Sequence, residues 1–268
     1  THAPTWPNLP AVQQILGANV VRVPLRLRDR RWVLDLEELF AACDSRTRAL
    51  LINSPANPTG WMLTDDEQQQ ILTFCRARGL WLIADEVYNR IVYDRPYAPT
   101  FADKISDDDR VLIVNSFSKS WAMTGWRLGW ITAPASLLTT LEMLTEFSSS
   151  CVLAAIQLAG VAALRQGEPS LQEALRRYKA SQDLLVEGFA DLPRVFLPVP
   201  EAAFYGFFSI DGVRDSQSFA LQALERAGVG LAPGLAFGPE GEGYVRLCYA
   251  VEPRLMAAAL DRLRPLLI

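Results

Sequence analysis

Short apolar runs alternate with amphipathic stretches through the first half of the chain. The apolar runs, rich in β-branched residues, predict buried strands at residues 20–23, 49–53, 80–84, 111–115 and 128–132. Helical spacing is found at residues 35–43 and 64–78, and the second stretch opens with a capping box of Thr64 and Glu67 and closes at Gly79. This alternation predicts an α/β fold, a three-layer sandwich around a mainly parallel sheet.

The pattern then becomes helical, and after Pro193 it changes to short strands between helices. Helices are predicted at residues 136–146, 152–165 and 171–189, and the last of these is long enough to bridge two domains. Strands at 204–210, 229–231 and 244–248, with helices at 216–227 and 253–267, predict a smaller α+β domain. We therefore expect a large domain at residues 1–178 and a small C-terminal domain at 179–268.

Composition excludes several classes of function. With 268 residues and a net charge of −4, the chain is not expected to bind nucleic acid or an anionic membrane. Its four cysteines lie far apart without a C-x-x-C motif, so neither a metal site nor a disulfide framework is expected. This cysteine pattern fits a protein of the reducing cytoplasm. No apolar run reaches transmembrane length, and no signal peptide is expected.

Histidine chemistry is hardly available, because His2 is the only histidine. A histidine-containing catalytic triad or a histidine-based metal site is therefore not expected, and the chemistry must rest on lysine, carboxylates, tyrosine or a cofactor. The chain also opens without a methionine and enters structured sequence at once, so we expect an N-terminally truncated piece.

Polar side chains gather after three of the predicted strands, at residues 53–57, 85–88 and 116–119. In open α/β sheets ligands bind at the carboxyl ends of the strands. Lys119 follows the buried strand at 111–115 and precedes Arg127 by eight residues. A lysine at the mouth of a sheet is either a solvated surface charge or a reactive amine, and an imine with pyridoxal 5'-phosphate (PLP) would explain its place.

A rival motif also contains Lys119. Ser116-Phe-Ser-Lys119 matches the S-x-x-K of penicillin-binding proteins and β-lactamases. That class needs S-D-N and K-T-G as partners and starts its motif at a helix, whereas this chain has neither tripeptide and its match follows a strand. The acyl-serine interpretation is therefore set aside.

The ordered set of motifs resembles a known family. Asn57-Pro-Thr-Gly60, Asp85-Glu-Val-Tyr88, Ser116-x-Ser-Lys119, Arg127-Leu-Gly and Gly241-Glu-Gly-Tyr-Val-Arg246 occur in this order. Together they closely resemble the class I/II aminotransferases, in the aspartate aminotransferase superfamily of fold-type I PLP enzymes. The resemblance extends from Thr5 to the C-terminus, and it implies the PLP-dependent transferase fold.

The resemblance also implies cofactor-binding roles. Lys119 would be the Schiff-base lysine, and Asp85 the carboxylate that keeps the pyridine nitrogen protonated. Tyr88 and Asn57 would donate to the phenolate oxygen. Taken singly, each residue also has a structural interpretation. Asp85 would be a helix cap, Asn57 a turn residue and Tyr88 a core aromatic.

Three further residues complete the implied site. Ser116 and Arg127 resemble the phosphate ligands, a hydroxyl and a bidentate guanidinium. Trp6 resembles the aromatic that stacks on the pyridine ring, although an ordinary buried tryptophan is equally consistent. Arg246, with Asn57, would bind the α-carboxylate of the substrate.

The implied activity is transfer of an amino group between an L-amino acid and a 2-oxo acid, with Lys119 as base and then acid. A homodimer is expected in the full-length protein. Because the family's N-terminal arm and phosphate loop precede these motifs, the chain by itself is expected to bind PLP weakly or not at all. Two alternatives stay open: a C–S lyase or synthase of the same superfamily, and the aminotransferase-like domain of a transcription regulator.

Overall fold

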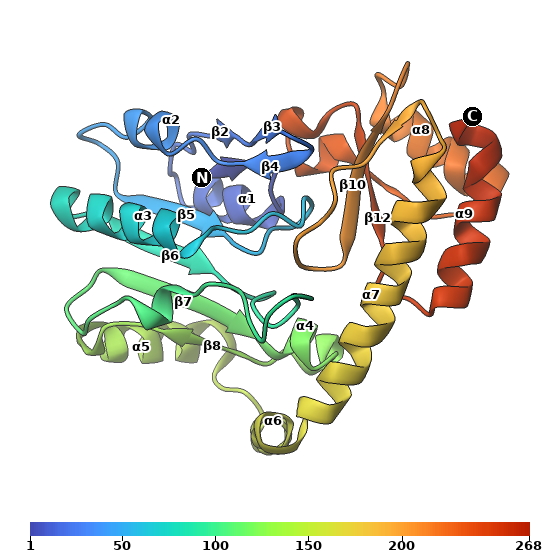
Figure 1. Ribbon diagram of the computed structural model, residues 1–268. Coiled ribbons are helices and arrows are strands. Elements are labelled where there is room, and N and C mark those ends of the chain that lie inside the picture. Colours follow the sequence, from blue (N-terminus) through green and yellow to red (C-terminus); the bar gives the residue numbers. More distant parts are fainter. The chain divides into compact units, whose positions relative to one another are not determined.

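The computed structural model describes all 268 residues, Thr1–Ile268, and groups them into two compact units (Figure 1). Unit 1 contains Thr1–Ala42, Ala56–Met62 and Ala174–Ile268, and unit 2 contains Cys43–Pro55 and Leu63–Glu173. The change at residue 174 lies close to the predicted boundary at 178. The first 42 residues, however, group with the C-terminal part rather than with the strands that follow them.

Unit 2 is built on a four-stranded sheet in the order β5-β6-β7-β8. The strands β5 (Ala49–Asn53), β6 (Trp81–Asp85) and β7 (Val111–Ser116) run parallel. The last strand, β8 (Gly129–Thr132), is antiparallel to β7. Between β7 and β8 the chain forms only short helical turns, and a parallel return would need a full crossover helix. The sheet is therefore mainly parallel, as predicted, with one antiparallel edge.

The helices of unit 2 begin and end close to their predicted bounds. Helix α3 (Asp65–Arg78) opens with the predicted capping box of Thr64 and Glu67 and closes at Gly79, which has φ 65°. A single turn, α4 (Phe117–Ser120), follows β7. The remaining helices are α5 (Leu138–Ser149) and α6 (Ala154–Gln166). Three 3-10 turns lie at Phe101–Asp103, Thr124–Trp126 and Ala135–Leu137.

Unit 1 contains an antiparallel sheet in the order β11-β12-β10-β9. Its strands are β9 (Val195–Phe196), β10 (Tyr205–Ile210), β11 (Ala232–Pro233) and β12 (Tyr244–Cys248). The helices of this part are α7 (Glu168–Ala190), which starts in unit 2, α8 (Ser216–Gln222) with its π-helical continuation Ala223–Ala227, and α9 (Pro253–Leu267). This α+β arrangement agrees with the prediction for the C-terminal part.

The N-terminal segment of unit 1 forms short elements. They are β1 (His2–Ala3) paired with β2 (Val23–Pro24), α1 (Asn8–Ile15), the hairpin β3 (Arg26–Arg28) and β4 (Arg31–Val33), and α2 (Leu36–Ala41). The segment joins the C-terminal sheet through Trp32, whose ring lies 6.0 Å from Phe207 and 5.4 Å from Tyr244. Buried aromatic contacts of this kind explain why residues far apart in sequence form one unit.

Some sequence predictions missed or misplaced elements. The prediction of a strand at 229–231 was wrong. The Val229 N–H donates to the Ala223 carbonyl at the end of the preceding helix, and strand pairing with β12 begins only at Ala232. Helix α1 and the β3–β4 hairpin were not predicted, because both are short and largely exposed. No helix of the structure combines the length and the hydropathy needed to cross a membrane.

Candidate active site

In unit 2 the structure brings Lys119, Asp85 and Tyr88 together. Asp85 ends β6, and Lys119 lies in α4 directly after β7, the parallel neighbour of β6. The Lys119 Nζ lies 5.6 Å from the centre of the Tyr88 ring, and its charge acts on the Asp85 carboxyl. Adjacent parallel strands end at the same edge of a sheet, so the topology itself assembles these three side chains.

The Asp85 carboxylate is held in a protein environment that disfavours its charge. Burial raises the pKa of Asp85 to about 6, against the opposing effects of the Val87 N–H, which donates at 3.2 Å, and of the Lys119 charge. The neighbouring Glu86 is better satisfied, since it accepts from Thr100 Oγ1 at 2.5 Å and from the Phe101 N–H at 2.9 Å. Asp85 is thus the carboxylate with capacity left for a cation.

Ser116 and Arg127 flank the start of β8. Ser116 caps α4, since its Oγ accepts from the Ser118 N–H at 3.1 Å and also donates to the Leu128 carbonyl at 3.4 Å. Arg127 has φ 53°, is exposed, and donates from Nη1 to the Thr124 carbonyl at 3.0 Å. The two side chains are therefore close in the chain fold, but each is engaged locally and no hydrogen bond joins them.

In unit 1 the structure joins Arg246 to Asn57. Arg246 lies in β12, and its Nη1 donates to the Asn57 Oδ1 at 2.7 Å. The guanidinium also lies 4.3 Å from the Tyr205 ring centre and 4.8 Å from that of Phe237. Its Nε is buried and has no hydrogen-bond partner. A fork held on two aromatic faces, with a donor left over, is suited to binding a carboxylate.

The turn that carries Asn57 is fixed by Gly60. The Gly60 carbonyl accepts from the Glu201 and Ala202 N–H groups at 3.2 and 3.0 Å. A Cβ on Gly60 would stand 2.7 Å from the Pro200 Cβ, and the residue has φ 69°. Only glycine allows this close approach, which explains the spacing of Asn57-Pro-Thr-Gly60.

Trp6 also belongs to unit 1. Its ring lies 6.4 Å from that of Phe237, one of the two aromatic rings beside Arg246. The side chain is 38% exposed, so the alternative of an ordinary buried tryptophan does not apply. The contact with Phe237 is supported by the neighbouring Thr5 N–H, which donates to the Phe237 carbonyl at 3.1 Å.

Two residues of the site were missed by the sequence analysis. Tyr205 and Phe237 both place a ring beside the Arg246 guanidinium, yet both look like ordinary core aromatics in the sequence. A usable signal existed for Tyr205, which opens a strand predicted to lie in the same domain as the strand of Arg246. None existed for Phe237, which comes from a 3-10 turn.

Comparison with known proteins identifies the family. The family model described as aminotransferase class I and II matches residues 1–263. This chain belongs to the class I and II aminotransferases. The α/β fold with a mixed sheet is also that of solved aminotransferases of fold-type I: the structure aligns with that of an aromatic aminotransferase from Pyrococcus horikoshii OT3 with a TM-score of 0.92 and 32% identity, covering 99% of this chain and 72% of that one.

Curated relatives agree with this assignment. The chain is 34% identical over 97% of its length to an aspartate aminotransferase of Musicola paradisiaca, and 36% identical over 91% of its length to an arginine–pyruvate transaminase of Pseudomonas aeruginosa. The chain spans 65% and 62% of the lengths of these two relatives.

Proposed function

We propose that this aminotransferase transfers an amino group between an L-amino acid and a 2-oxo acid, with PLP as cofactor and Lys119 as the catalytic residue. The observation that carries the proposal is the group of Lys119, Asp85 and Tyr88 at the carboxyl ends of β6 and β7. The proposal is supported by the relatives, which are named for the transamination of aspartate, arginine and aromatic amino acids.

The residues present fit PLP. Asp85 has a raised pKa and accepts a single backbone hydrogen bond, so a protonated pyridine nitrogen would give it the charge partner that it lacks. Ser116 and Arg127 would hold the phosphate, and the Tyr88 hydroxyl and the Asn57 amide would donate to the phenolate oxygen. Trp6 would lie against the ring.

When bound, PLP supplies an electron sink for negative charge on the substrate Cα. Lys119 Nζ would hold the cofactor until the amino acid takes its place, and would then remove the proton from Cα and return it as an acid. Arg246 would bind the α-carboxylate through its guanidinium, which the Tyr205 and Phe237 rings hold flat. The Asn57 Oδ1, which accepts from the Arg246 Nη1, would help to keep this guanidinium in place.

The alternatives predict other products. The relatives are named aminotransferases, which favours nitrogen transfer over C–S lysis and over a role in a transcription regulator.

A homodimer and a cytoplasmic location remain parts of the proposal. The homodimer is supported by the resemblance, and the cytoplasmic location by the four cysteines, which form no disulfide.

A pair of substitutions tests the role of Lys119. Lys119→Ala and Lys119→Arg should each lower the rate of amino transfer by at least about 10³-fold, because neither side chain can take up and return the proton at neutral pH. Lys179→Ala, at an exposed lysine, is the matched control and should keep the activity. The assay follows the new amino acid and the new 2-oxo acid together.

Two results would contradict the proposal. Retention of transfer by both Lys119 variants would exclude Lys119 as the acid–base group. Release of ammonia with a 2-oxo acid, without consumption of the acceptor, would establish a lyase.

A further inference from the structure

The last residue of β5 makes a side-chain contact with the end of β6. Asn53 pairs with Asp85 in the parallel register of the two strands, and it is fully buried. Its Nδ2 donates to the Asp85 carbonyl oxygen at 3.2 Å. The same oxygen accepts from the Ser54 N–H at 3.0 Å, a hydrogen bond that continues the strand ladder. The Asp85 carbonyl therefore has two donors, one from the backbone and one from the Asn53 side chain.

These contacts fix the peptide group that follows Asp85. On the side of β7, the Glu86 N–H donates to the Val114 carbonyl at 2.9 Å. The peptide group between Asp85 and Glu86 is thus held from both neighbouring strands. Its orientation sets the direction of the Asp85 Cα–Cβ bond, and the Val87 N–H, which donates to Oδ1 at 3.2 Å, holds the carboxylate itself. A rotation of this peptide group would turn the carboxylate.

An amide is not the residue type that packing alone would place at this position. The three residues before it in β5, Leu50, Leu51 and Ile52, are apolar and buried. A buried polar side chain costs free energy unless its hydrogen bonds are made. The change from apolar residues to an amide occurs directly opposite Asp85, where a donor can reach the Asp85 carbonyl.

The Asn53 side chain also fills space next to Asp85. Burial is the main reason that the pKa of Asp85 is raised to about 6. Removal of the Asn53 amide would leave a cavity bordered by the Asp85 carbonyl, and a polar cavity of that size takes up water. The Asn53 side chain therefore contributes to the environment of the carboxylate as well as to its direction.

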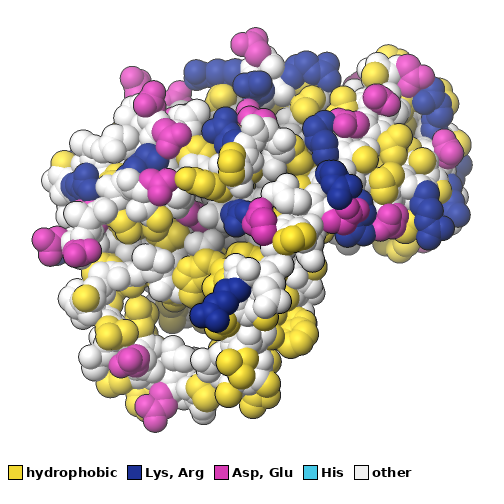
Figure 2. Space-filling model, turned by 60° about the horizontal axis from the view of Figure 1, so that its bottom comes forward, with side chains coloured by type: hydrophobic (Ala, Val, Ile, Leu, Met, Phe, Trp, Pro, Cys, Tyr) yellow, Lys and Arg dark blue, Asp and Glu magenta, His cyan; other side chains and the backbone are white.

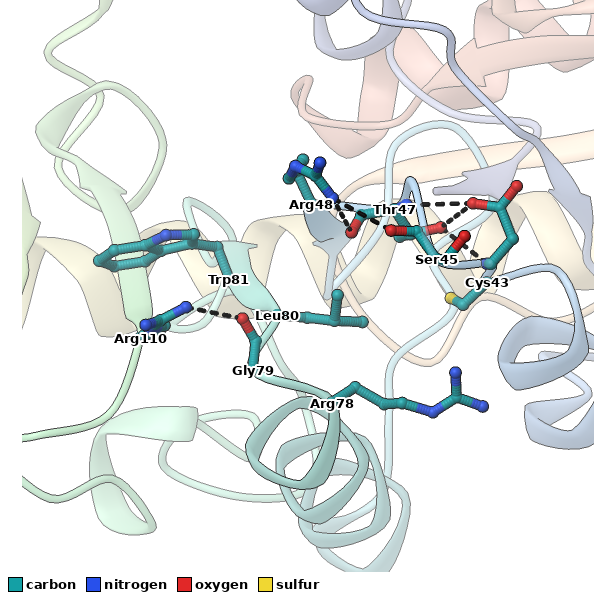
Figure 3. Close-up of a pocket in the computed structure, with 10 residues that line it drawn as sticks. Cys43, Ser45, Thr47, Arg48, Arg78, Gly79, Leu80, Trp81 and Arg110 are labelled. Atoms are coloured by element: carbon teal, nitrogen blue, oxygen red, sulfur yellow. Dashed lines mark hydrogen bonds between the residues drawn. The ribbon is translucent and has the colours of Figure 1, made fainter.

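The other end of the same sheet has no comparable arrangement of side chains. A pocket of about 390 Å³ lies there, and its lining includes Arg48, which precedes β5, and Arg110, which precedes β7. Figure 3 shows these two arginines and Arg78 pointing in different directions around Leu80. Polar side chains thus converge at the carboxyl ends of the strands rather than at the amino ends.

We propose that Asn53 is a positioning residue for Asp85. Its amide fixes the Asp85 peptide group, and so directs the carboxylate and keeps water away from it. The inference rests on the proposed function in one respect, because the direction of the carboxylate matters only if Asp85 faces the pyridine nitrogen of PLP. Asn53 acts through Asp85 and touches neither cofactor nor substrate in this role.

The test is carbon NMR of the side-chain carboxyl groups in the cofactor-free protein as a function of pH. The Asp85 signal is identified by its loss in Asp85→Asn, and in the wild type it should titrate with a midpoint of about 6. In Asn53→Ala the midpoint should fall by roughly one pH unit, because water then reaches the carboxylate.

Ser54→Ala is the matched control for this titration. It removes a buried hydroxyl that accepts from the Leu63 N–H at 2.9 Å, and it leaves the N–H that bonds to Asp85 in place. The Asp85 midpoint should therefore stay at its wild-type value. A loss of packing at the end of β5 would act on both variants alike, whereas a positioning role acts on Asn53→Ala alone.

A second variant keeps the shape of the Asn53 side chain. Asn53→Asp places a like charge beside Asp85, so the Asp85 midpoint should rise above its wild-type value. In the cofactor-loaded enzyme, Asn53→Ala should lower kcat by roughly tenfold, the equivalent of one pKa unit. The KM for the amino acid should not change, because the substrate carboxylate is assigned to Arg246.

An Asp85 midpoint that is unchanged in both Asn53 variants overturns the inference, whatever the rate of amino transfer. Equal shifts in Asn53→Ala and Ser54→Ala overturn it as well. Failure of the proposed function has a different signature: the Lys119 variants would keep the activity, while the Asp85 midpoint would still depend on Asn53.

Discussion

Asp85 and Glu86 are adjacent acids with different surroundings. Burial raises the pKa of both. Glu86 is fully buried, but its two oxygens accept from Thr100 and from the Phe101 N–H, so it ties the turn after β6 to a second segment. Asp85 accepts only from the Val87 N–H. The first acid therefore has the chemistry of a ligand-binding group, and the second that of a structural one.

Asp85→Asn should stabilise the cofactor-free protein at neutral pH. Burial raises the pKa of Asp85 to about 6 in the folded protein, from an ordinary value of 3.8 in the unfolded chain. The charged Asp85 carboxylate therefore lowers the free energy of unfolding. This loss of stability is full above pH 6 and disappears as the pH falls toward 3.8, because the carboxyl group is then protonated in both states. We expect a gain on the order of 1–2 kcal/mol, allowing for the partial exposure of the side chain.

Denaturant titrations at about pH 7.5 and about pH 5 check this expectation, since the gain should be clearly smaller at the lower pH. Amino transfer should be lost in the same variant. A variant that is less stable than the wild type at neutral pH would show that the Asp85 charge is compensated in the fold.

The turn from Asn57 to Gly60 shows how one element positions a site. Strand β5 belongs to unit 2, but Ala56–Met62, which begin three residues after its end, belong to unit 1. The Gly60 carbonyl holds them there through the Glu201 and Ala202 N–H groups. This attachment places Asn57 beside Arg246, 189 residues later in the chain.

Gly60→Ala should destabilise the protein by about 2–4 kcal/mol, because the added Cβ is strained and also meets neighbouring atoms. The nearest of these are the Pro200 Cβ at 2.7 Å and the Ala202 carbonyl oxygen at 2.8 Å. Gly230→Ala is the control, since a Cβ there meets nothing within 4 Å. Thermal unfolding compares the two, and equal melting temperatures would refute the packing argument.

The molecule leaves many apolar side chains of unit 2 exposed. No residue of α5 is buried, and Gly160 is the only buried residue of α6. A surface helix normally buries one apolar stripe against the core. In α5 and α6 the apolar side chains are instead exposed. Figure 2 shows yellow hydrophobic side chains in patches with few charges among them. The exposed apolar side chains of the two helices include Leu138, Met143, Leu144, Phe147, Leu158, Val161 and Leu164.

We expect the chain to self-associate through α5 and α6. Phe147 is 83% exposed and Leu158 is 70% exposed. The double variant Phe147→Glu, Leu158→Glu should therefore remain more monomeric at high concentration, without loss of thermal stability. Light scattering after size-exclusion chromatography measures the mass, and Leu255→Glu, at an exposed leucine of α9, is the control. Unchanged association in the double variant would show that other surfaces are responsible.

Local patterns were enough to predict much of this protein. The bounds of β5 and α9 and the capping box of α3 follow from short-range rules, because caps and strand propensity act over a few residues. The residues of the Lys119 group were implied by the family resemblance. The family also followed from the order of its motifs, and the comparison confirmed it.

Long-range packing settled the rest. The antiparallel direction of β8, the grouping of residues 1–42 with the C-terminal sheet, and the two aromatic rings around Arg246 depend on contacts between distant segments. The same is true of the pocket lined by Arg48, Arg78 and Arg110, because its lining residues come from separate parts of the sequence. Such contacts carry no local signature, since they arise from the free energy of burying side chains that the chain order keeps apart.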